Sequence, residues 1–165
     1  MKIFIFLPVL FFATSAFSQD TGSKYQRLFQ FIELDHGVAE VKEGKISKMK
    51  NTPTGVHGWL KDFVIIKVTD SVRTIPKTNF GVVYLIKASD TLDINVEIEW
   101  IYPTEVTNEK GEHFKSIKYI TKRPTNIPSA SSYSLDEPYE LVNGKWTMNI
   151  YIENKPVYTK TFFLY

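Results

Sequence analysis

Three histidines, the residue type most often used for acid–base catalysis and metal binding, are spread widely along this sequence. They are His36, His57 and His113, separated by 21 and 56 residues, and each lies in a segment rich in turn-forming residues. Neither interval matches a paired metal-ligand motif, and the chain has no cysteine to supply a thiolate ligand or nucleophile. We interpret the three histidines as solvated loop residues. The alternative is a small secreted hydrolase whose site is assembled by folding from loop histidines and carboxylates, which requires a histidine beside a buried acid in a cleft.

Two carboxylates, Glu97 and Glu99, lie two residues apart in the sequence. Opposed across a cleft, such a pair could catalyse glycoside hydrolysis, but neighbours on one strand face are more often its solvated side. Asp90, Asp93 and Asn95 offer oxygen ligands for calcium, yet they lack the glycine and distal glutamate of a helix-loop-helix calcium site. The sequence therefore predicts no catalytic residue, no metal ligand and no cofactor-binding residue.

Nucleophile and nucleotide motifs are missing from the sequence, which has no G-x-S-x-G string, phosphate-binding glycine loop or dinucleotide fingerprint. We interpret a serine cluster as a flexible loop, and a lysine cluster diluted by two glutamates as a solvated loop. Trp59 follows a histidine and a glycine, and we expect it to pack in the core rather than to form a binding platform. The serines are Ser129, Ser131 and Ser132, the lysines are Lys42, Lys45, Lys48 and Lys50, and the glutamates are Glu40 and Glu43.

The first eighteen residues, MKIFIFLPVLFFATSAFS, have the pattern of a secretory signal peptide. Lys2 precedes an apolar run from Ile3 to Phe12, and the small residues Ala16 and Ser18 precede the predicted cleavage site. The run contains a proline and is shorter than the roughly 20 residues of a membrane-spanning helix. We therefore expect cleavage and export to the periplasm, the cell surface or the extracellular space, with an uncleaved anchor as the alternative.

Residues 19–165 are predicted to form one domain. Their number, 165 − 18 = 147, is enough for one full core and too small for two ordinary domains. Without the signal the formal net charge falls from +2 to 19 − 18 = +1, which gives no reason to expect a nucleic-acid partner. No later apolar stretch has membrane-spanning length, so we expect no integral membrane segment after cleavage.

Alternation of apolar and polar residues is the main structural signal. Six apolar residues of the segment 91–102 fall on one parity, which is typical of a strand with one buried and one solvated face. Residues 63–68 (FVIIKV) and 80–86 (FGVVYLI) are almost continuously apolar and predict central strands covered on both faces. The alternating apolar residues are Leu92, Ile94, Val96, Ile98, Trp100 and Tyr102.

Other segments give weaker signals. Residues 114–121 predict a strand, and residues 25–34, whose spacing also fits a helix, favour a strand that ends in a turn at 35–37. Proline and glycine punctuate the remaining segments and predict loops there. These expected loops are 42–58, 73–79, 103–113 and 122–132.

The C-terminal segment carries a strong hairpin signal. Asn143-Gly144 lies between YELV and KWTM, and this dipeptide favours a two-residue type I′ loop. The hairpin would place Leu141 opposite Trp146 on an apolar face, with Trp146 in the core. A second turn at 154–156 is expected to lead into a last strand over 157–164, with Pro156 at its start.

Two barrel architectures compete with a sandwich. Gly144-Lys145-Trp146 resembles the G-x-W string of lipocalins, which in that family opens the first strand, whereas here it lies near the last. The aromatic segment 162–165 resembles the end signal of outer-membrane barrels, but most expected strands are shorter than the roughly 9 to 11 residues of a spanning strand. Seven or eight short strands without a clear helix instead predict an antiparallel β-sandwich.

A set of motifs in the C-terminal half supports the sandwich. It consists of an aromatic-proline pair, a Glu-Leu-x-x-Gly-x-Trp hairpin and a final strand with a phenylalanine: Tyr102-Pro103, Glu140-Leu141, Gly144, Trp146 and Phe162. Over about residues 27–164 the chain resembles a bacterial family of exported domains of unknown function. The resemblance implies an immunoglobulin-like fold and implies no activity or catalytic residues.

The sequence therefore predicts an all-β protein, a single immunoglobulin-like antiparallel β-sandwich of seven to eight strands behind a signal peptide. We expect an exported non-catalytic module for binding or assembly rather than an enzyme. The expected partner is a protein or glycan of the cell envelope, and the sequence leaves the ligand-binding residues unknown.

Overall fold

The structure, a computed structural model, describes residues 29–165 and is built almost entirely of β-strands. The predicted signal peptide and its cleavage site lie outside the described residues. Within 29–165, no helix is long and apolar enough to cross a membrane. The elements in this range are β1 (Gln30–Lys48), β2 (Val56–Val68), β3 (Ser71–Val72), β4 (Asn79–Lys87), β5 (Asp93–Thr107), β6 (His113–Pro124), β7 (Ser129–Ser134), the 3-10 helix η1 (Pro138–Glu140), β8 (Gly144–Ile152) and β9 (Lys155–Leu164).

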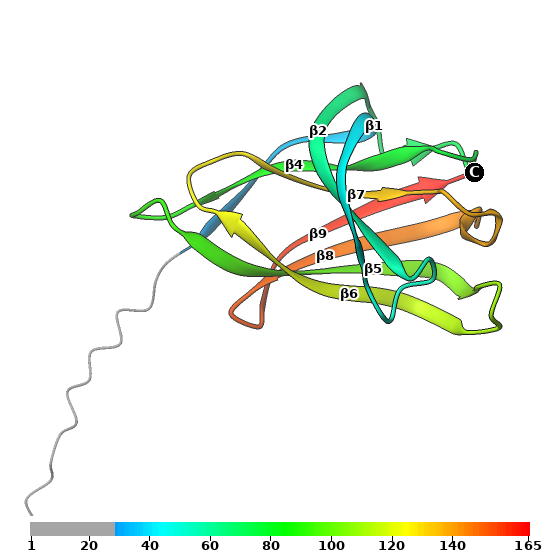
Figure 1. Cartoon of the computed structure of the whole chain (residues 1–165). Coiled ribbons are helices and arrows are strands. Elements are labelled where there is room, and N and C mark those ends of the chain that lie inside the picture. The colour runs from blue at the N-terminus through cyan, green and yellow to red at the C-terminus, as the bar shows by residue number, and fades with distance from the viewer. Residues whose placement is uncertain (1–28) are drawn as a thin grey trace, which may run out of the picture.

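The strands form two separate sheets that stack as a sandwich (Figure 1). Sheet A has the order β2-β1-β4-β7, and sheet B has the order β3-β9-β8-β5-β6. Neighbouring strands are antiparallel except for the short β3, which runs parallel to β9. The predicted all-β sandwich is thus confirmed, with nine strands in the described residues instead of seven or eight.

The core lies between the two sheets, where alternate residues of β5 and β8 point inward. The inward-facing residues of β5 that the alternation predicted are at most 9% exposed: Ile94, Val96, Ile98, Trp100 and Tyr102. Leu92, just before β5, is partly buried and packs against this core. Four fully buried rings contact one another at the centre of the core: Phe80, Trp100, Trp146 and Phe162. Burial of side chains of this size contributes about 1.5 to 3 kcal/mol each, so this cluster stabilises the contact between the two sheets.

Strand β1 is long and does not turn where a turn was predicted. It extends over 19 residues, so the strand predicted at 25–34 is confirmed over 30–34, while residues 25–28 lie outside the described residues. The predicted turn at 35–37 is wrong. Gly37 makes this possible, because a Cβ there would lie 2.0 Å from the Lys67 carbonyl oxygen of β2. At this point β1 exchanges its partner, pairing with β4 through Ala39 and with β2 from Gly37 onward.

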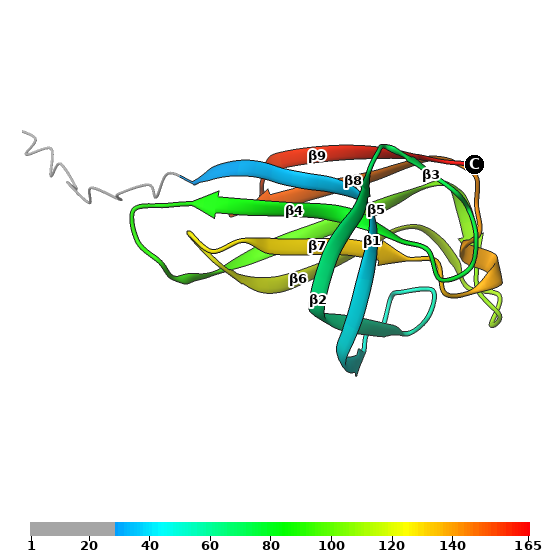
Figure 2. The same cartoon turned by 90° about the horizontal axis from the view of Figure 1, so that it is seen from above.

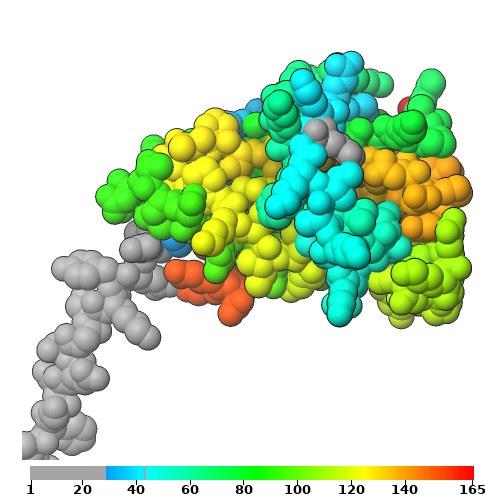
Figure 3. All heavy atoms as spheres, viewed as in Figure 1, coloured from blue at the N-terminus to red at the C-terminus, as the bar shows by residue number. Residues whose placement is uncertain are grey.

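Residues 39–68, the second half of β1 with β2, form a two-stranded projection that we call the arm. It leaves sheet A and extends across the open side of the sandwich next to β7 and β6 (Figure 2). In the space-filling view the arm lies over this side of the molecule (Figure 3). The predicted loop 42–58 is therefore mostly strand, with the tip of the arm at 49–55.

The segment 63–68 forms the end of β2, an edge strand, and not a central one. Val64, Ile66 and Val68 are 57 to 64% exposed. The β-branched side chains favour an extended backbone, and the prediction of a strand here is confirmed. They do not ensure that other elements cover both faces of that strand. Segment 80–86 lies in β4 between β1 and β7 and confirms the prediction of a central strand.

Two expected loops, 103–113 and 122–132, are shorter than predicted because the flanking strands are longer. β5 extends to Thr107, β6 ends at Pro124, and β7 takes up residues 129–134. The expected strand at 114–121 lies within β6, and the expected loop at 73–79 is observed up to the start of β4.

The predicted hairpin at Asn143-Gly144 is wrong. Pro138 opens the helix η1, so the segment before Asn143 is not a strand. Gly144 has φ +128°, and a Cβ there would lie 2.7 Å from the Pro103 Cβ, so this glycine permits a close approach instead of a hairpin loop.

The rest of the C-terminal segment agrees with the prediction in part. Trp146 is fully buried, as expected, although it pairs with Phe162 of β9 and not with Leu141. A second turn is present, but it lies at Glu153 and Asn154, with φ values of 51° and 62°, and not at the predicted 154–156. β9 therefore begins at Lys155, before the predicted start at 157.

Candidate functional site

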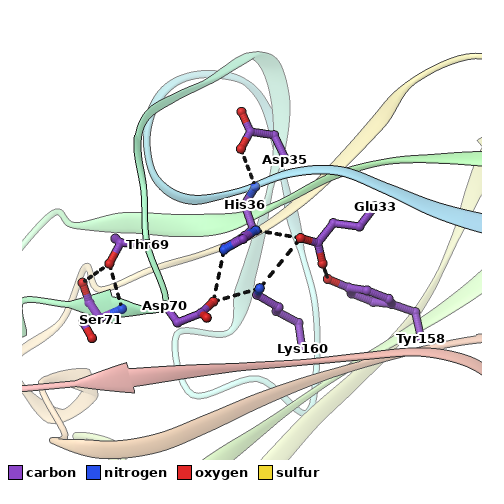
Figure 4. A network of polar contacts seen from close by, with 8 residues as sticks. All are labelled: Glu33, Asp35, His36, Thr69, Asp70, Ser71, Tyr158 and Lys160. Atoms are coloured by element: carbon purple, nitrogen blue, oxygen red, sulfur yellow. Dashed lines mark hydrogen bonds and ion pairs between the residues drawn. The ribbon is translucent and has the colours of Figure 1, made fainter.

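A charged cluster joins β1 of sheet A to β9 of sheet B, and we call it the clamp (Figure 4). His36 Nδ1 lies 2.6 Å from Glu33 Oε1, and His36 Nε2 lies 3.2 Å from Asp70 Oδ1. Lys160 Nζ lies 2.8 Å from the same Asp70 oxygen and 3.7 Å from Glu33 Oε1. The Tyr158 hydroxyl donates a hydrogen bond to Glu33 Oε2.

The contacts within the clamp tie β1, β9 and Asp70 together. Burial opposes ionisation of Glu33, but the Tyr158 hydrogen bond and the charges of Lys160 and His36 outweigh it and lower the pKa of this carboxyl. Burial and the contact with Glu33 raise the pKa of the Tyr158 hydroxyl. The side chains of Glu33 and Asp70 are 30% and 49% exposed, and His36 lines neither pocket described below. His36 therefore lacks the buried acid and the cleft that the hydrolase hypothesis requires.

The other two histidines also lie on strands, so the prediction of three loop histidines is wrong. His113, on β6, is 61% exposed and contacts Thr107 and Glu105 at 3.0 Å. His57, on β2, is half-buried between the rings of Trp59 and Tyr119, whose centroids lie 5.1 and 4.6 Å away. Burial, with the nearby charge of Arg123, lowers the pKa of His57 and favours a neutral ring.

The carboxylates of β5 lie on the outer face of the sheet and contact neighbouring strands. Glu97 forms an ion pair with Lys118 at 2.8 Å. Glu99 accepts hydrogen bonds from Asn149 at 3.1 Å and from the Tyr151 hydroxyl at 2.7 Å. These acids do not face one another across a cleft. Among the described residues, no group of three or more histidine, aspartate or glutamate side chains is arranged to hold a metal ion, so Asp90 and Asp93 belong to no such group.

Two further interpretations are corrected by the structure. The serine cluster is strand β7, where Ser131 is 2% exposed and shares a hydrogen bond with Tyr84. Trp59 does not pack in the core: it is 38% exposed, and its indole N–H donates to Ser47. The lysines at 42, 45, 48 and 50 are solvated, as expected, although most belong to β1.

A pocket of about 410 Å³, which we call the arm pocket, lies between the arm and strands β5 to β7. Val41 and Leu60 of the arm and Ile117 of β6 supply apolar wall. Trp100 also lines it, and its fully buried indole N–H has no hydrogen-bond partner among residues 29–165.

A buried acid, Glu140 of η1, borders the arm pocket and accepts three hydrogen bonds from the chain around it. Tyr133 donates to its Oε1 at 2.6 Å, and the backbone N–H groups of Asp136 and Glu137 donate to its Oε2 at 3.1 Å. Burial raises the pKa of Glu140, and the Tyr133 hydrogen bond partly opposes that shift. Because all these donors belong to the same loop and β7, the carboxyl fixes the chain rather than a ligand.

A second pocket, the arginine pocket, lies on the other side of the contact between His57 and Tyr119 and has a volume of about 450 Å³. Its walls combine the two basic side chains Lys61 and Arg123 with the aromatic rings of Trp59, Phe63 and Tyr119. Neither pocket could be predicted from the sequence, because both form only where the arm meets strands that are distant in the chain.

The fold has a solved counterpart. It is similar to the crystal structure of an immunoglobulin-like protein from Pseudomonas aeruginosa, with a TM-score of 0.62 and 17% sequence identity over 86% of this chain and 99% of that one. A family GH3 β-glucosidase of Bifidobacterium adolescentis gives a TM-score of 0.32 and 10% identity over 84% of this chain and 17% of that one, too low to support an argument. No curated protein matches the sequence.

The class defined by the fold and by these comparisons is the immunoglobulin-like β-sandwich. Within it, this chain belongs to the family described as Domain of unknown function (DUF3859), which it matches over residues 34–164. This agrees with the predicted resemblance to an immunoglobulin-like domain of unknown function.

Proposed function

We propose that this protein is an exported, non-catalytic binding module that uses the arm and the two pockets beneath it to hold its ligand. The observation that carries the proposal is the arm itself, which extends from sheet A across the open side of the sandwich and encloses both pockets. Binding sites of small domains are typically such concave, partly apolar surfaces.

The chemistry of the described residues favours binding over catalysis. The buried acid Glu140 accepts three hydrogen bonds from the chain around it, and the acids of the clamp are paired with cations. His57, the histidine that lines both pockets, has no acid within ion-pair distance among the described side chains. An acid–base pair poised at a pocket, which hydrolysis would need, is therefore missing from this part of the chain.

Export rests on the pattern of residues 1–18, which has the charged, apolar and small-residue parts of a signal peptide. The proposed location is the periplasm or the cell surface, and the proposed partner is a protein or glycan of the envelope. Osmotic shock without detergent should release the protein, with Gln19 as its first residue. Retention in the cytoplasmic fraction with an intact N-terminus would contradict export.

The binding role can be tested with the isotope-labelled mature protein. We expect envelope glycans or peptides in a screening panel to shift amide resonances of the arm, β6 and β7, and Trp59→Ala to weaken that binding. Phe163→Ala, which removes an exposed ring on β9, is the matched control and should leave binding unchanged. Turnover of a glycoside, ester or peptide substrate, or a panel that leaves the arm resonances unmoved, would refute the proposal.

A further inference from the structure

We propose that the arginine pocket binds a small organic anion, a flat aromatic or similarly apolar group that carries a carboxylate. This inference rests on the proposed binding function and names the class of ligand for one of its two pockets. Its basis is a cationic side chain without a counter-charge, placed among aromatic walls.

Arg123 has only neutral partners. Its Nε donates to the Tyr84 hydroxyl at 3.3 Å, and its Nη1 donates to Thr121 Oγ1 at 3.1 Å and to the Lys122 carbonyl at 3.3 Å. Its Nη2 donates to the Ala130 carbonyl at 3.3 Å. These four contacts fix the half-buried guanidinium between β6 and β7, and one of its five N–H groups, on Nη2, is left over.

The charge of Arg123 is not balanced by the described part of the chain. No ion pair found among the described side chains includes Arg123 or Lys61. The described residues that line the pocket include both of these bases and no aspartate or glutamate. The charge of Arg123 also contributes to the lowered pKa of His57 in the same wall. A partly buried cation without a counter-ion attracts an anion, and a carboxylate is the natural partner of a guanidinium.

The remaining walls select for an apolar body attached to the anion. Trp59, Phe63 and Tyr119 present aromatic surface, and the Trp59 ring is held in place by its hydrogen bond to Ser47. Val83 and Pro128 extend the apolar wall. At about 450 Å³ the pocket is within the range of small-molecule sites. An inorganic anion would satisfy Arg123 but would leave these rings uncovered.

The test uses the mature protein and three probes: 1-naphthoate, its neutral analogue 1-naphthamide, and inorganic phosphate. We expect naphthoate to shift the Trp59 indole and Arg123 Nε resonances saturably, with a dissociation constant of about 1 mM or lower. Binding should weaken at about 1 M salt because the attraction is partly electrostatic. Naphthamide and phosphate should each bind at least about tenfold more weakly.

Two variants address the role of charge. Arg123→Gln keeps a planar donor but removes the charge, and we expect a loss of about tenfold or more in naphthoate affinity. Lys61→Glu is a second variant in case Arg123→Gln does not fold. Lys61 is exposed, so this change should leave the fold intact, and we expect it to weaken naphthoate binding as well. Arg73→Gln, an exposed arginine outside the pocket, is the matched control and should bind like the unchanged protein.

Three results would overturn the inference: no saturable shift at about 10 mM naphthoate, equal affinity for naphthamide, or unchanged affinity in Lys61→Glu. If neutral glycans or peptides shift the arm while naphthoate does not, the anion assignment fails and the binding function stands. If no probe or panel member shifts the arm, the binding function fails as well.

Discussion

At the scale of single residues, burial and saturated hydrogen bonds identify the side chains on which the fold depends. Trp146 illustrates this, because its ring is fully buried against Tyr102, Tyr133 and Phe80 and its N–H donates to the Val142 carbonyl at 2.9 Å. The alternation in β8 was enough to predict that Trp146 faces the core. The exposure of Trp59 could not be predicted, since an isolated tryptophan beside a glycine shows no periodicity.

Replacement of Trp146 by alanine should reduce the free energy of unfolding by about 3 to 5 kcal/mol, because it leaves a large cavity at the centre of the core. Urea denaturation of the variant measures this loss. Trp59→Ala is the matched control on the surface and should cost far less. Equal losses in the two variants would show that Trp146 is not a core residue.

Glu140 offers a second test at this scale, since three donors converge on its carboxyl. Glu140→Leu leaves these donors buried without an acceptor, and we expect a loss of at least about 2 kcal/mol in unfolding free energy. Glu140→Gln should cost less, because its amide oxygen can replace one carboxyl oxygen and the Tyr133 hydroxyl can turn toward Tyr102, 3.0 Å away. Denaturant unfolding of both variants checks the order, and a glutamine variant as unstable as the leucine variant would contradict it.

At the scale of elements, strand identity could be predicted far better than strand position. Period-two alternation predicted β5 and β8, and continuous β-branched segments predicted that β4 and the end of β2 are strands. The same signal predicted that both segments are central, which is right for β4 and wrong for the end of β2, because pairing with distant strands decides coverage. Likewise, Asn143-Gly144 has the composition of a hairpin, but Pro138 and the close approach of Pro103 to Gly144 determine the local structure.

The turn between β8 and β9 is the hairpin that the structure does contain. Glu153 and Asn154 both have positive φ, which is costly for glutamate. The double variant Glu153→Asn with Asn154→Gly should therefore raise the unfolding free energy by about 0.5 to 1 kcal/mol. Thermal and urea unfolding measure the gain. The pair Asn143→Gly with Gly144→Asn serves as the opposite control, because a side chain at position 144 collides with Pro103, and it should destabilise the protein.

At the scale of the whole molecule, the two long sides of the sandwich are closed in different ways. The clamp joins the sheets on one side through β1 and β9, and the arm covers the other side over β6 and β7. The sandwich itself could be predicted from the number and regularity of the strands. The arm and both pockets could not, since they depend on where β1 changes its partner at Gly37.

The clamp should make the joining of the sheets sensitive to acid. The pKa of Glu33 is lowered in the folded protein, so its stabilising contribution is present above the ordinary value of 4.5 and is lost as the pH falls through the folded value. In the Glu33→Gln variant, the free energy of unfolding should therefore decrease less steeply as the pH falls below 4.5. Chemical denaturation at a series of pH values measures the slope. Glu109→Gln, which removes an exposed loop carboxyl, is the control, and equal slopes in the two variants would contradict the role of the clamp.

Strand β9 has a further consequence for how the protein is made. It supplies Phe162 and Leu164 to the core, Lys160 to the clamp and the partner of β3, so neither sheet B nor the contact between the sheets is complete without it. A ribosome synthesises β9 last among the nine strands of the described residues, and non-local strand pairing is slow to form. The sandwich can therefore be completed only after β9 has been synthesised.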